Sequence, residues 1–409
     1  MRNAMESKVV GGVLLVAGTT IGAAMLALPI STGLAGFIPA QVLFLVYWAY
    51  MTYTAFLILE VNLRMDGDVD MITMADRTLG RAGKLLAWAS YLFLLYSLTT
   101  AYLSVSGAVF LDAVEVLSGW QLPDWLGPLP LLFMFSYFVY RGAAAADRLN
   151  RVLMAVMALI FVVLLVRLSP EVQLDLLART NWRYSLLGVS VVATSFGFHI
   201  IIPTLTAYLK RDAGELKRVL LIGSLIPIVV YTLWQLVTLG IIPVSGTVSL
   251  KMGYEEGLNS ASLLALLLHS PVLQLLARFF TFLAVMTSFL GVSLSLWHCL
   301  KDGFKLTEEG RGSAFLYIMT FGPPLCFAMT SPRAFLTALE YAGAFGVVIL
   351  LGLLPACMVW SARKQQQGVG RGYRIRGGKP ALIAVILLSL VVIGVELLTK
   401  TGVLQQWVL

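Results

Sequence analysis

The stretch Val-Ala-Gly-Thr-Thr-Ile-Gly-Ala-Ala-Met-Leu at residues 16–26 decides how this chain folds. It lies in the middle of an apolar segment, and it has a counterpart in Thr-Ser-Phe-Gly-Phe-His at residues 194–199, in the middle of a second one. Within a bilayer, backbone groups left unpaired by such an interruption are tolerated only where a ligand, an ion or a water-filled cavity satisfies them. Two interruptions half a chain apart therefore predict a transporter with its binding site between two broken helices.

The composition indicates a membrane protein. Hydrophobic residues make up 59% of the chain and charged residues only 12%, and the mean hydropathy is +0.88. Apolar stretches of roughly 20 residues, the length that crosses a bilayer, recur along the whole sequence. We expect eleven membrane spans, near residues 8–32, 38–63, 84–113, 126–141, 148–168, 186–210, 217–241, 272–300, 313–331, 335–361 and 380–400.

The connections between these spans are too short to fold as separate domains, so residues 1–409 are predicted to form one all-α membrane domain. The longest outer loop covers residues 242–271 and contains the apolar run Ala261–Leu268. Because this run is too short to cross a bilayer, we expect a surface helix or a lid over an outward-facing cavity.

The Lys and Arg residues predict the orientation of the chain, since cytoplasmic loops retain positive charge. A cytoplasmic N-terminus places most of the 29 Lys and Arg residues inside, and an odd number of spans places the C-terminus outside. This distribution also explains the net charge of +8 without a nucleic-acid partner. The first apolar segment continues past any plausible cleavage region, so we expect a membrane span rather than a removed signal peptide.

The sequence contains no motif of an enzyme active site. It has three histidines and lacks the zinc-protease, serine-hydrolase and P-loop patterns. Cys299, Cys326 and Cys357 lie in or beside spans without metal or disulfide spacing, and we expect them to be packing residues. The sequence contains no repeated segment of the kind that forms a selectivity filter, so it does not indicate a channel. A receptor that binds an amino acid without moving it is the alternative class, although no cytoplasmic output domain supports it.

Each helix break offers two kinds of ligand-binding group. A half-helix N-terminus carries free N–H groups and partial positive charge, and a half-helix C-terminus carries free carbonyls. The N–H groups that follow Gly18 or Gly22 suit a carboxylate, whereas the carbonyls near Ala17 and Ser195 suit an ammonium group and a cation. A zwitterionic amino acid is therefore the expected ligand.

At these breaks the chain resembles the hydroxy and aromatic amino acid permeases, within the amino acid-polyamine-organocation superfamily, and most of all their bacterial tyrosine permease branch. The resemblance covers nearly the whole chain and is strongest in four stretches. They are Val-Ala-Gly-Thr-Thr-Ile-Gly-Ala-Ala-Met-Leu-Ala-Leu-Pro at 16–29, Thr-Ser-Phe-Gly-Phe-His at 194–199, Thr-Ser-Phe-Leu-Gly at 287–291 and Gly-Tyr-Arg-Ile-Arg-Gly-Gly-Lys-Pro-Ala at 372–381. It implies the leucine-transporter fold, with inverted repeats at about 8–168 and 186–361 and an extra helix at 380–400.

The resemblance also implies a function. It implies import of L-tyrosine, or of tryptophan, phenylalanine or another neutral amino acid, across a bacterial inner membrane by cation-coupled symport. We expect no cofactor besides the coupling cation and no obligate protein partner, with the lipid bilayer as the surroundings.

The predicted substrate-binding residues come from the two breaks and from span 3. They are Ala17, Gly18, Thr19, Thr20, Gly22, Tyr96, Ser195, Phe196, Gly197, Phe198 and His199, with Tyr102 as a further candidate in span 3. The two phenylalanines would offer an aromatic face to a substrate ring, although phenylalanine is also common in membrane helices. His199 would either contact substrate or fix the broken backbone.

The coupling cation is open between Na⁺ and H⁺. In the leucine-transporter fold, sodium lies between carbonyls of span 1 and hydroxyls of span 8, which here implies a site at Ala17, Thr20, Thr287 and Ser288. Some proton-coupled relatives place a lysine of span 5 there, whereas this chain has Met157 at about that place, which slightly favours sodium. Glu60, Glu340 and Glu396 lie within spans and are candidate proton carriers.

Arg278 and Glu340 stand at comparable depths from the outer ends of spans 8 and 10. A buried charge needs a partner, so we expect the two residues to pair. The pair would act either as an outer gate or as a static salt bridge.

Overall fold

The computed structural model describes residues 2–67, 69–133, 143–304, 311–330, 333–365 and 373–403. Over these residues the chain forms helices and no strand. Nine of the helices are long and apolar enough to cross a membrane, and the bent pair Lys8–Thr20 and Ala24–Gly33 makes a tenth. These ten segments match ten of the predicted spans in position, while half of the span predicted near 126–141 lies outside the described residues.

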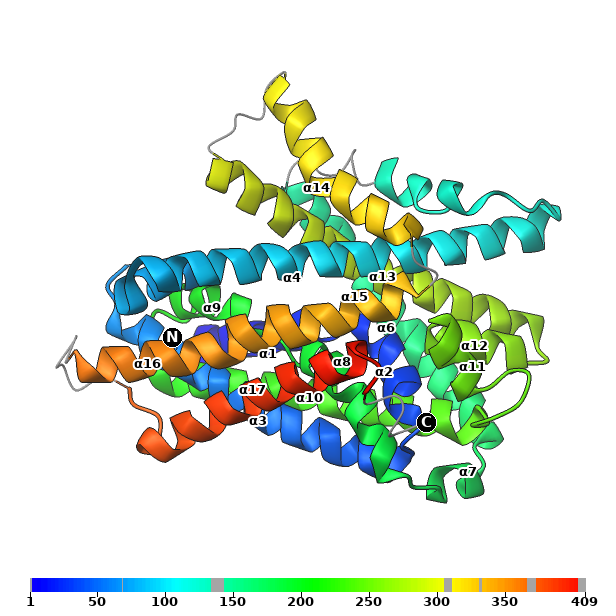
Figure 1. Ribbon diagram of the computed structural model, residues 1–409, viewed down its shortest axis with the longest axis horizontal. Coiled ribbons are helices and arrows are strands. Elements are labelled where there is room, and N and C mark those ends of the chain that lie inside the picture. Colours follow the sequence, from blue (N-terminus) through cyan, green and yellow to red (C-terminus); the bar gives the residue numbers. More distant parts are fainter. Residues whose placement is uncertain are drawn as a thin grey trace.

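The first half of the chain contains one bent segment and three long helices. The bent segment consists of α1 (Arg2–Thr20) and α2 (Ala24–Gly33), which meet at an angle of 54°. It is followed by α3 (Phe37–Arg64), α4 (Met71–Ser118) and α6 (Ala143–Leu168), with the 3₁₀ turn η1 (Asp124–Leu126) between the last two. Figure 1 shows α4 running along the length of the bundle.

A second interrupted segment opens the other half. The short elements η2 (Ser169–Glu171) and α7 (Leu174–Ala178) lead into η3 (Trp182–Gly188) and α8 (Val189–Ser195). After an irregular stretch come η4 (His199–Ile201) and α9 (Ile202–Tyr208). Two long helices follow, α10 (Ala213–Ile241) and α13 (Pro271–Phe304), with the short α11 (Leu250–Glu256) and α12 (Ser260–Leu267) between them.

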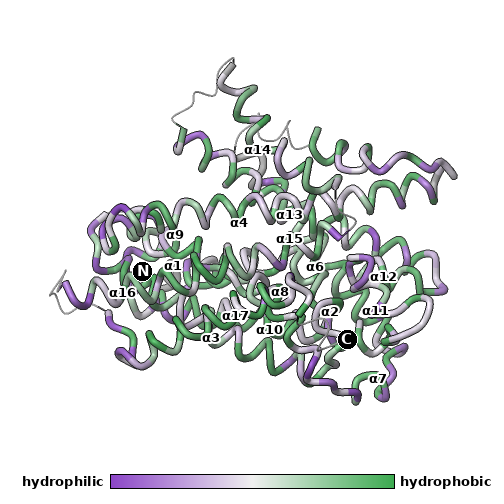
Figure 2. The backbone as a smooth tube through the Cα atoms, viewed as in Figure 1, coloured by the Kyte–Doolittle hydropathy of each residue, from purple (hydrophilic) through white to green (hydrophobic). Residues whose placement is uncertain are grey.

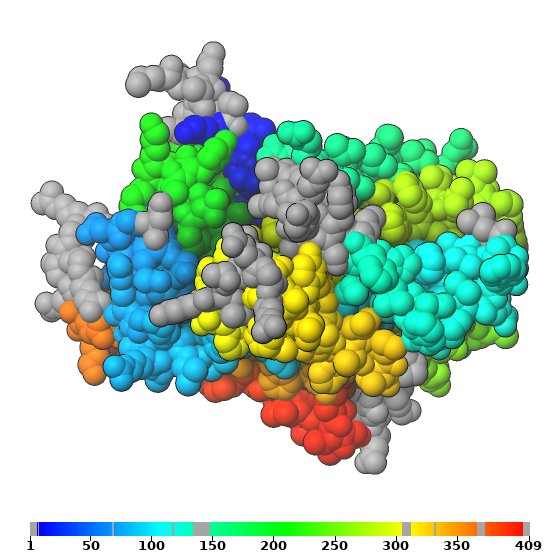
Figure 3. All heavy atoms as spheres, turned by 90° about the horizontal axis from the view of Figure 1, so that it is seen from above, coloured from blue at the N-terminus to red at the C-terminus, as the bar shows by residue number. Residues whose placement is uncertain are grey.

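The last three spans end the described chain. They begin with α14 (Arg311–Thr330), which packs against α4 and α13. The next span is α15 (Ala334–Tyr341), the π-helix η5 (Ala342–Leu353) and α16 (Leu354–Lys364) in direct succession. The final helix, α17 (Gly378–Lys400), packs on η5 and α16 and lies at one edge of the molecule (Figure 3).

Polar side chains fix where several helices begin. The side chains of Asp70, Asp212, Ser249 and Asn259 accept hydrogen bonds from backbone N–H groups in the first turns of α4, α10, α11 and α12. Such caps satisfy donors that have no partner within the helix. Hydrophilic residues gather towards the two ends of the long axis, and the helices between them are mostly hydrophobic (Figure 2). This distribution suits a bundle that crosses a bilayer along that axis.

The apolar run at 261–268 forms the short helix α12, as its length predicts. It is not a loosely held surface helix, because five of its residues, including Ala261 and Leu264, are buried. The indole N–H of Trp234 donates to Ser260 Oγ at 3.0 Å, and Thr281 Oγ1 donates to Asn259 Oδ1 at 3.3 Å. These contacts fasten α12 to α10 and α13, so a lid role stays a prediction.

Candidate functional site

The first predicted interruption is a true break in the helix. Helix α1 ends at Thr20 and α2 begins at Ala24, so residues 21–23 form what we call the first break. The N–H of Ala23 donates to Ser288 Oγ on α13 at 2.9 Å. A Cβ atom placed on Gly22 would lie 2.4 Å from the same oxygen, which explains why glycine stands there. The first break is therefore packed directly against α13.

The second predicted interruption is also found. Helix α8 ends at Ser195, and Phe196, Gly197 and Phe198 form the second break before η4 begins. The backbone of Gly197 lies against the π-helix η5, because a Cβ atom there would be 3.2 Å from Leu351 Cδ1. The second break lies within the predicted stretch 194–199, whereas the first overlaps the predicted stretch 17–22 only at Ile21 and Gly22.

A single tyrosine of α10 joins the two breaks. The hydroxyl oxygen of Tyr231 lies 2.7 Å from the carbonyl oxygen of Thr20 and 2.9 Å from that of Ser195, the last residues of α1 and α8. A phenol carries one proton, so it donates to one carbonyl at a time or divides the bond between them. The two breaks therefore lie side by side, with carbonyls from both meeting at one hydroxyl.

Aromatic rings surround this meeting point. The ring centroid of Phe196 is 5.4 Å from that of Tyr231 and 6.1 Å from that of Phe44 on α3, both in edge-to-face arrangements. Phe196 and Phe198 are each only 1% exposed. The structure thus gathers aromatic surface at the second break, which suits an aromatic ligand without showing that one contacts it.

Of the two candidate tyrosines of span 3, Tyr102 lies at the breaks and Tyr96 does not. The Tyr102 side chain hydrogen-bonds Ser288 and lies near Tyr231. The Tyr96 hydroxyl donates instead to the carbonyl of Met319 on α14 at 2.7 Å. The Tyr96 hydroxyl therefore bonds a neighbouring helix, which does not favour its predicted contact with substrate.

Thr19 is also placed away from the site. Its side chain is exposed and its hydroxyl donates to the Leu15 carbonyl at 2.7 Å on its own helix. Gly18 faces span 5, where a Cβ atom would lie 2.8 Å from Met154 Cε. Met154 is thus a methionine of span 5 that lies beside α1, and the predicted place of Met157 stays a prediction. Thr20 is buried and its carbonyl faces Tyr231, as described above.

His199 is completely buried and anchors the second break to α3. Its Nε2 lies 2.8 Å from Thr54 Oγ1, and the Thr54 hydroxyl donates to the Met51 carbonyl at 3.1 Å. The Thr54 hydroxyl has one proton, so Nε2 is the donor in the tautomer that leaves Thr54 free to bond Met51. Nδ1 has no hydrogen-bond partner among the described residues. This contact suits the predicted role of fixing the broken backbone, while a contact with substrate stays a prediction.

The groups predicted for the cation lie on the elements that meet at the first break. The hydroxyls of Thr287 and Ser288 donate to the Ala284 carbonyl at 3.1 and 2.9 Å, which leaves lone pairs on both oxygens. One lone pair of Ser288 Oγ accepts from Ala23. The carbonyl of Ala17 accepts from the Ile21 N–H at 2.8 Å, and the Thr20 hydroxyl donates to Val16 at 2.7 Å. All four residues offer oxygen atoms, but Ser288 Oγ is also bonded by Ala23 and Tyr102, so a cation site here stays a prediction.

The predicted pair of Arg278 and Glu340 does not form. Arg278 Nε lies 2.8 Å from Asp112 Oδ2 on α4, and Lys400 Nζ on α17 lies 2.6 Å from Glu340 Oε2. Arg278 thus pairs with α4 and Glu340 with α17, and the prediction considered neither helix. A gate made by these two residues is therefore not proposed.

Glu60 is held by four donors at one end of the bundle. Its carboxylate accepts from Arg64 at 2.7 Å, from Arg363 at 2.9 and 2.7 Å, and from the Ile375 N–H at 2.9 Å. Hydrogen bonds and opposite charges of this kind stabilise an ionised carboxylate. The geometry therefore makes Glu60 an anchor between α3, α16 and the segment before α17.

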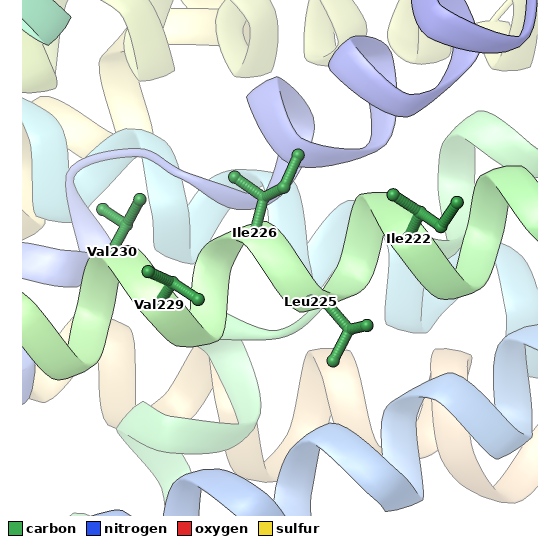
Figure 4. A pocket seen from close by; sticks show the side chains of 5 residues that line it. All are labelled: Ile222, Leu225, Ile226, Val229 and Val230. Atoms are coloured by element: carbon green, nitrogen blue, oxygen red, sulfur yellow. The ribbon is translucent and has the colours of Figure 1, made fainter.

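A hollow on α10 is lined by Ile222, Leu225, Ile226, Val229 and Val230 (Figure 4). All five side chains are aliphatic and come from one helix. Sites for small molecules combine apolar walls with a few placed polar groups. The hollow lacks polar groups, so it suits a lipid chain better than an amino acid.

Sequence reasoning missed Tyr231, the residue that joins the two breaks. The signal was present, because a buried tyrosine in the middle of the mostly apolar stretch 217–241 needs a polar partner for its hydroxyl. The stretch alone does not tell which partner that is.

The bent and broken helices, and the polar groups enclosed where they meet, define the class of the protein as a multi-pass membrane transporter. Comparison with known proteins agrees. The family model of the tryptophan/tyrosine permease family matches residues 5–396. The chain therefore belongs to this family of permeases and is a transporter rather than an enzyme.

Three relatives are similar over nearly their whole length, and all come from Haemophilus influenzae. The chain is 34% identical to tyrosine-specific transport system 1, covering 97% of this chain and 98% of the relative. It is 32% identical to tyrosine-specific transport system 2, over 98% of both chains. It is 30% identical to a tryptophan-specific transport protein, over 96% of both.

Proposed function

We propose that this protein is a secondary active transporter that imports L-tyrosine across a bacterial inner membrane by cation-coupled symport. Its family membership and its similarity to two tyrosine-specific relatives support the substrate class. The single observation that carries the mechanism is the Tyr231 hydroxyl, which lies within hydrogen-bond distance of carbonyls from both broken segments. Tryptophan is the second candidate substrate, because another relative is tryptophan-specific.

The proposed site is the space bounded by the two breaks. The substrate carboxylate would bind N–H groups at the start of α2, where the helix dipole favours an anion. Its ammonium group would bind carbonyls at the ends of α1 and α8, where Tyr231 now donates. Its ring would pack against Phe196 and its aromatic neighbours, with Phe44 at 6.1 Å between centroids. Each part of an aromatic amino acid thus has a matching surface.

We extend the proposal to the fold and its orientation. The bent pair α1 and α2, and the broken pair α8 and α9, stand at corresponding positions in the two halves, which supports the leucine-transporter fold of five plus five spans with α17 added. Together with the span predicted near 126–141, the ten described segments would make eleven spans. The basic residues then place the N-terminus inside and the C-terminus outside.

Uptake into proteoliposomes tests the proposal. The purified protein should accumulate radiolabelled L-tyrosine when either a sodium gradient or a proton gradient is imposed, and unlabelled tryptophan or phenylalanine should compete. A receptor that does not transport would bind tyrosine without exchanging labelled for internal unlabelled substrate. Folded protein that neither accumulates nor exchanges tyrosine would refute the assignment, and the same assay with other neutral amino acids would then identify the substrate.

A further inference from the structure

Two buried carboxylates share one ammonium group beside the broken helix α8. Glu340 on α15 and Glu396 on α17 are 3% and 4% exposed. Lys400 Nζ lies 2.6 Å from Glu340 Oε2 and 3.5 Å from Glu396 Oε1. Burying two negative charges with one positive charge in contact is unfavourable. Among the described residues, this cluster therefore has two carboxylates and one cation in contact with them, whereas Glu60 contacts two guanidinium groups.

A second cation acts on this cluster from beyond salt-bridge distance. The guanidinium of Arg333 lies over the ring of Tyr254 on α11, 4.7 Å from its centroid, and its charge reaches Glu340 without forming an ion pair with it. Tyr341 on α15 lies under Lys400, with 4.8 Å between Nζ and the ring centroid. Within salt-bridge distance of either carboxylate, Lys400 is the cation that the described structure provides.

The cluster is joined to the second break by hydrogen bonds. Ser190 Oγ on α8 donates to Glu396 Oε2 at 2.6 Å. One turn further along α8, Thr194 Oγ1 lies 3.0 Å from the carbonyl of Leu339, the neighbour of Glu340. Helix α8 ends at Ser195, whose carbonyl faces Tyr231. A charge change at the carboxylates thus acts on a helix of seven residues that forms one wall of the proposed substrate site.

The helix that carries Glu340 has an unusual conformation at this place. Directly after α15, the twelve residues of η5 are π-helical and pack against α8, α4 and α17. A Cβ atom on Gly343 would overlap the Ser190 carbonyl, so the two helices touch backbone to backbone. π-Helical segments are rare and are frequently found at functional sites. This is a second, independent indication that the contact between α8 and span 10 matters for function.

We infer that Glu340 and Glu396, with Lys400 between them, form the proton-binding site that couples the proton gradient to transport. This inference rests on the proposed function. A proton entering from the side of higher proton concentration binds one of the two carboxylates, and Lys400 then neutralises the other. The hydrogen bonds through Ser190 and Thr194 pass this change to α8. When the site opens to the other side, the same proton leaves and the carboxylate is ionised again, so one proton crosses with each substrate.

Two transport assays separate coupling from substrate movement. Counterflow exchanges external labelled tyrosine for internal unlabelled tyrosine and needs no gradient, whereas accumulation requires the coupling ion. For Glu396→Gln, whose amide stands in for the protonated acid, we expect counterflow within about twofold of the native rate and loss of accumulation driven by a proton gradient. Glu340→Gln should behave in the same way. The exposed Glu255→Gln, at a residue 59% exposed, is the matched control and should keep both activities.

A pH series sharpens the test. Native counterflow should vary with the pH on both sides of the membrane, whereas counterflow by Glu396→Gln should lose that dependence. Ser190→Ala, which keeps both carboxylates, should lower accumulation more than counterflow.

If one glutamine variant does not elute as a folded species, the other glutamine variant and Ser190→Ala still test the inference. Proton-driven accumulation at the native level in the folded variants, or native accumulation driven by sodium alone, would overturn the inference. Absence of native counterflow would instead refute tyrosine transport itself.

Discussion

The hydroxyl oxygen of Tyr231 lies 2.7 Å from the carbonyl oxygen of Thr20, at the end of the first half of a helix that bends by 54°. The same hydroxyl reaches the Ser195 carbonyl at the end of the other broken helix. Carbonyls at helix C-termini carry partial negative charge and need donors. Tyr231 therefore supplies, from within the protein, the kind of donor that a substrate ammonium group would supply.

Replacing Tyr231 by phenylalanine tests this relationship. The variant keeps the ring that packs on Phe196, at 5.4 Å between centroids, and removes the hydroxyl. Leaving a buried acceptor unpaired costs about 1–3 kcal/mol, so the thermal midpoint should fall by several degrees. We also expect tyrosine counterflow to fall by about tenfold or more, because the relative position of the two breaks is no longer fixed.

Tyr96→Phe is the matched control for that variant. It too removes one tyrosine hydroxyl bonded to a backbone carbonyl, but its partner, Met319, lies on α14 away from the breaks. It should lower stability by a similar amount and leave counterflow near the native rate. Equal losses of transport in Tyr96→Phe and Tyr231→Phe would show that Tyr231 has no special place in the site.

Gly22→Ala should block transport by steric conflict. The added Cβ would lie 2.4 Å from Ser288 Oγ, and moving that oxygen breaks its hydrogen bond to the Ala23 N–H. Counterflow by folded protein is the measurement, and a strong loss is expected. The double variant Gly22→Ala with Ser288→Ala removes the conflict and should recover part of the activity, because contacting residues are not additive.

Gly291→Ala is the control for that pair. It lies on α13 one turn from Ser288, and a Cβ there meets no atom within 4 Å. We expect native transport from it. If Gly22→Ala transports as well as Gly291→Ala, the close contact between the first break and α13 is not required.

Glu60 should matter for stability rather than for coupling. Replacing it by alanine leaves the guanidinium of Arg363, which is 11% exposed, without its carboxylate partner. Breaking a buried pair in this way costs about 3–5 kcal/mol. Thermal unfolding in detergent should show a large loss of stability. Asp76→Ala, which breaks an exposed pair with Lys84 at 3.1 Å, should cost less than about 1 kcal/mol. A small loss in both variants would contradict the anchor role.

The sequence predicts where helices are interrupted and which segments are too short to cross the membrane. The sequence predicts interruptions at 17–22 and 194–199, and the structure has breaks at 21–23 and 196–198. The first break begins later than predicted, because Gly18, Thr19 and Thr20 still belong to α1. The apolar run that becomes α12 is predicted too, since its length fixes it as too short to span.

The sequence does not predict how each helix is rotated about its own axis, and so which neighbours its side chains face. Neighbouring positions differ by about 100° around a helix, so Thr19 faces outwards while Thr20 is buried. In the same way Tyr96 and Tyr102, six positions apart on α4, face different neighbours. Ion pairs depend further on which helices become neighbours, and Glu340 finds Lys400 on the added helix α17 instead of Arg278. These contacts arise from tertiary packing, which no single stretch of sequence contains.

The last prediction concerns the aromatic surface at the second break. Phe196→Leu keeps an apolar side chain but removes the ring that contacts Tyr231 and Phe44. An aromatic contact contributes about 0.5–1.5 kcal/mol beyond burial, so the apparent affinity for tyrosine should fall by about two- to tenfold. Competition of labelled tyrosine uptake by tyrosine, tryptophan and leucine measures the effect. The preference for aromatic competitors over leucine should shrink in Phe196→Leu and stay unchanged in Phe279→Leu, whose ring is 45% exposed on the outer face of α13. An unchanged preference in both variants would place the substrate ring elsewhere.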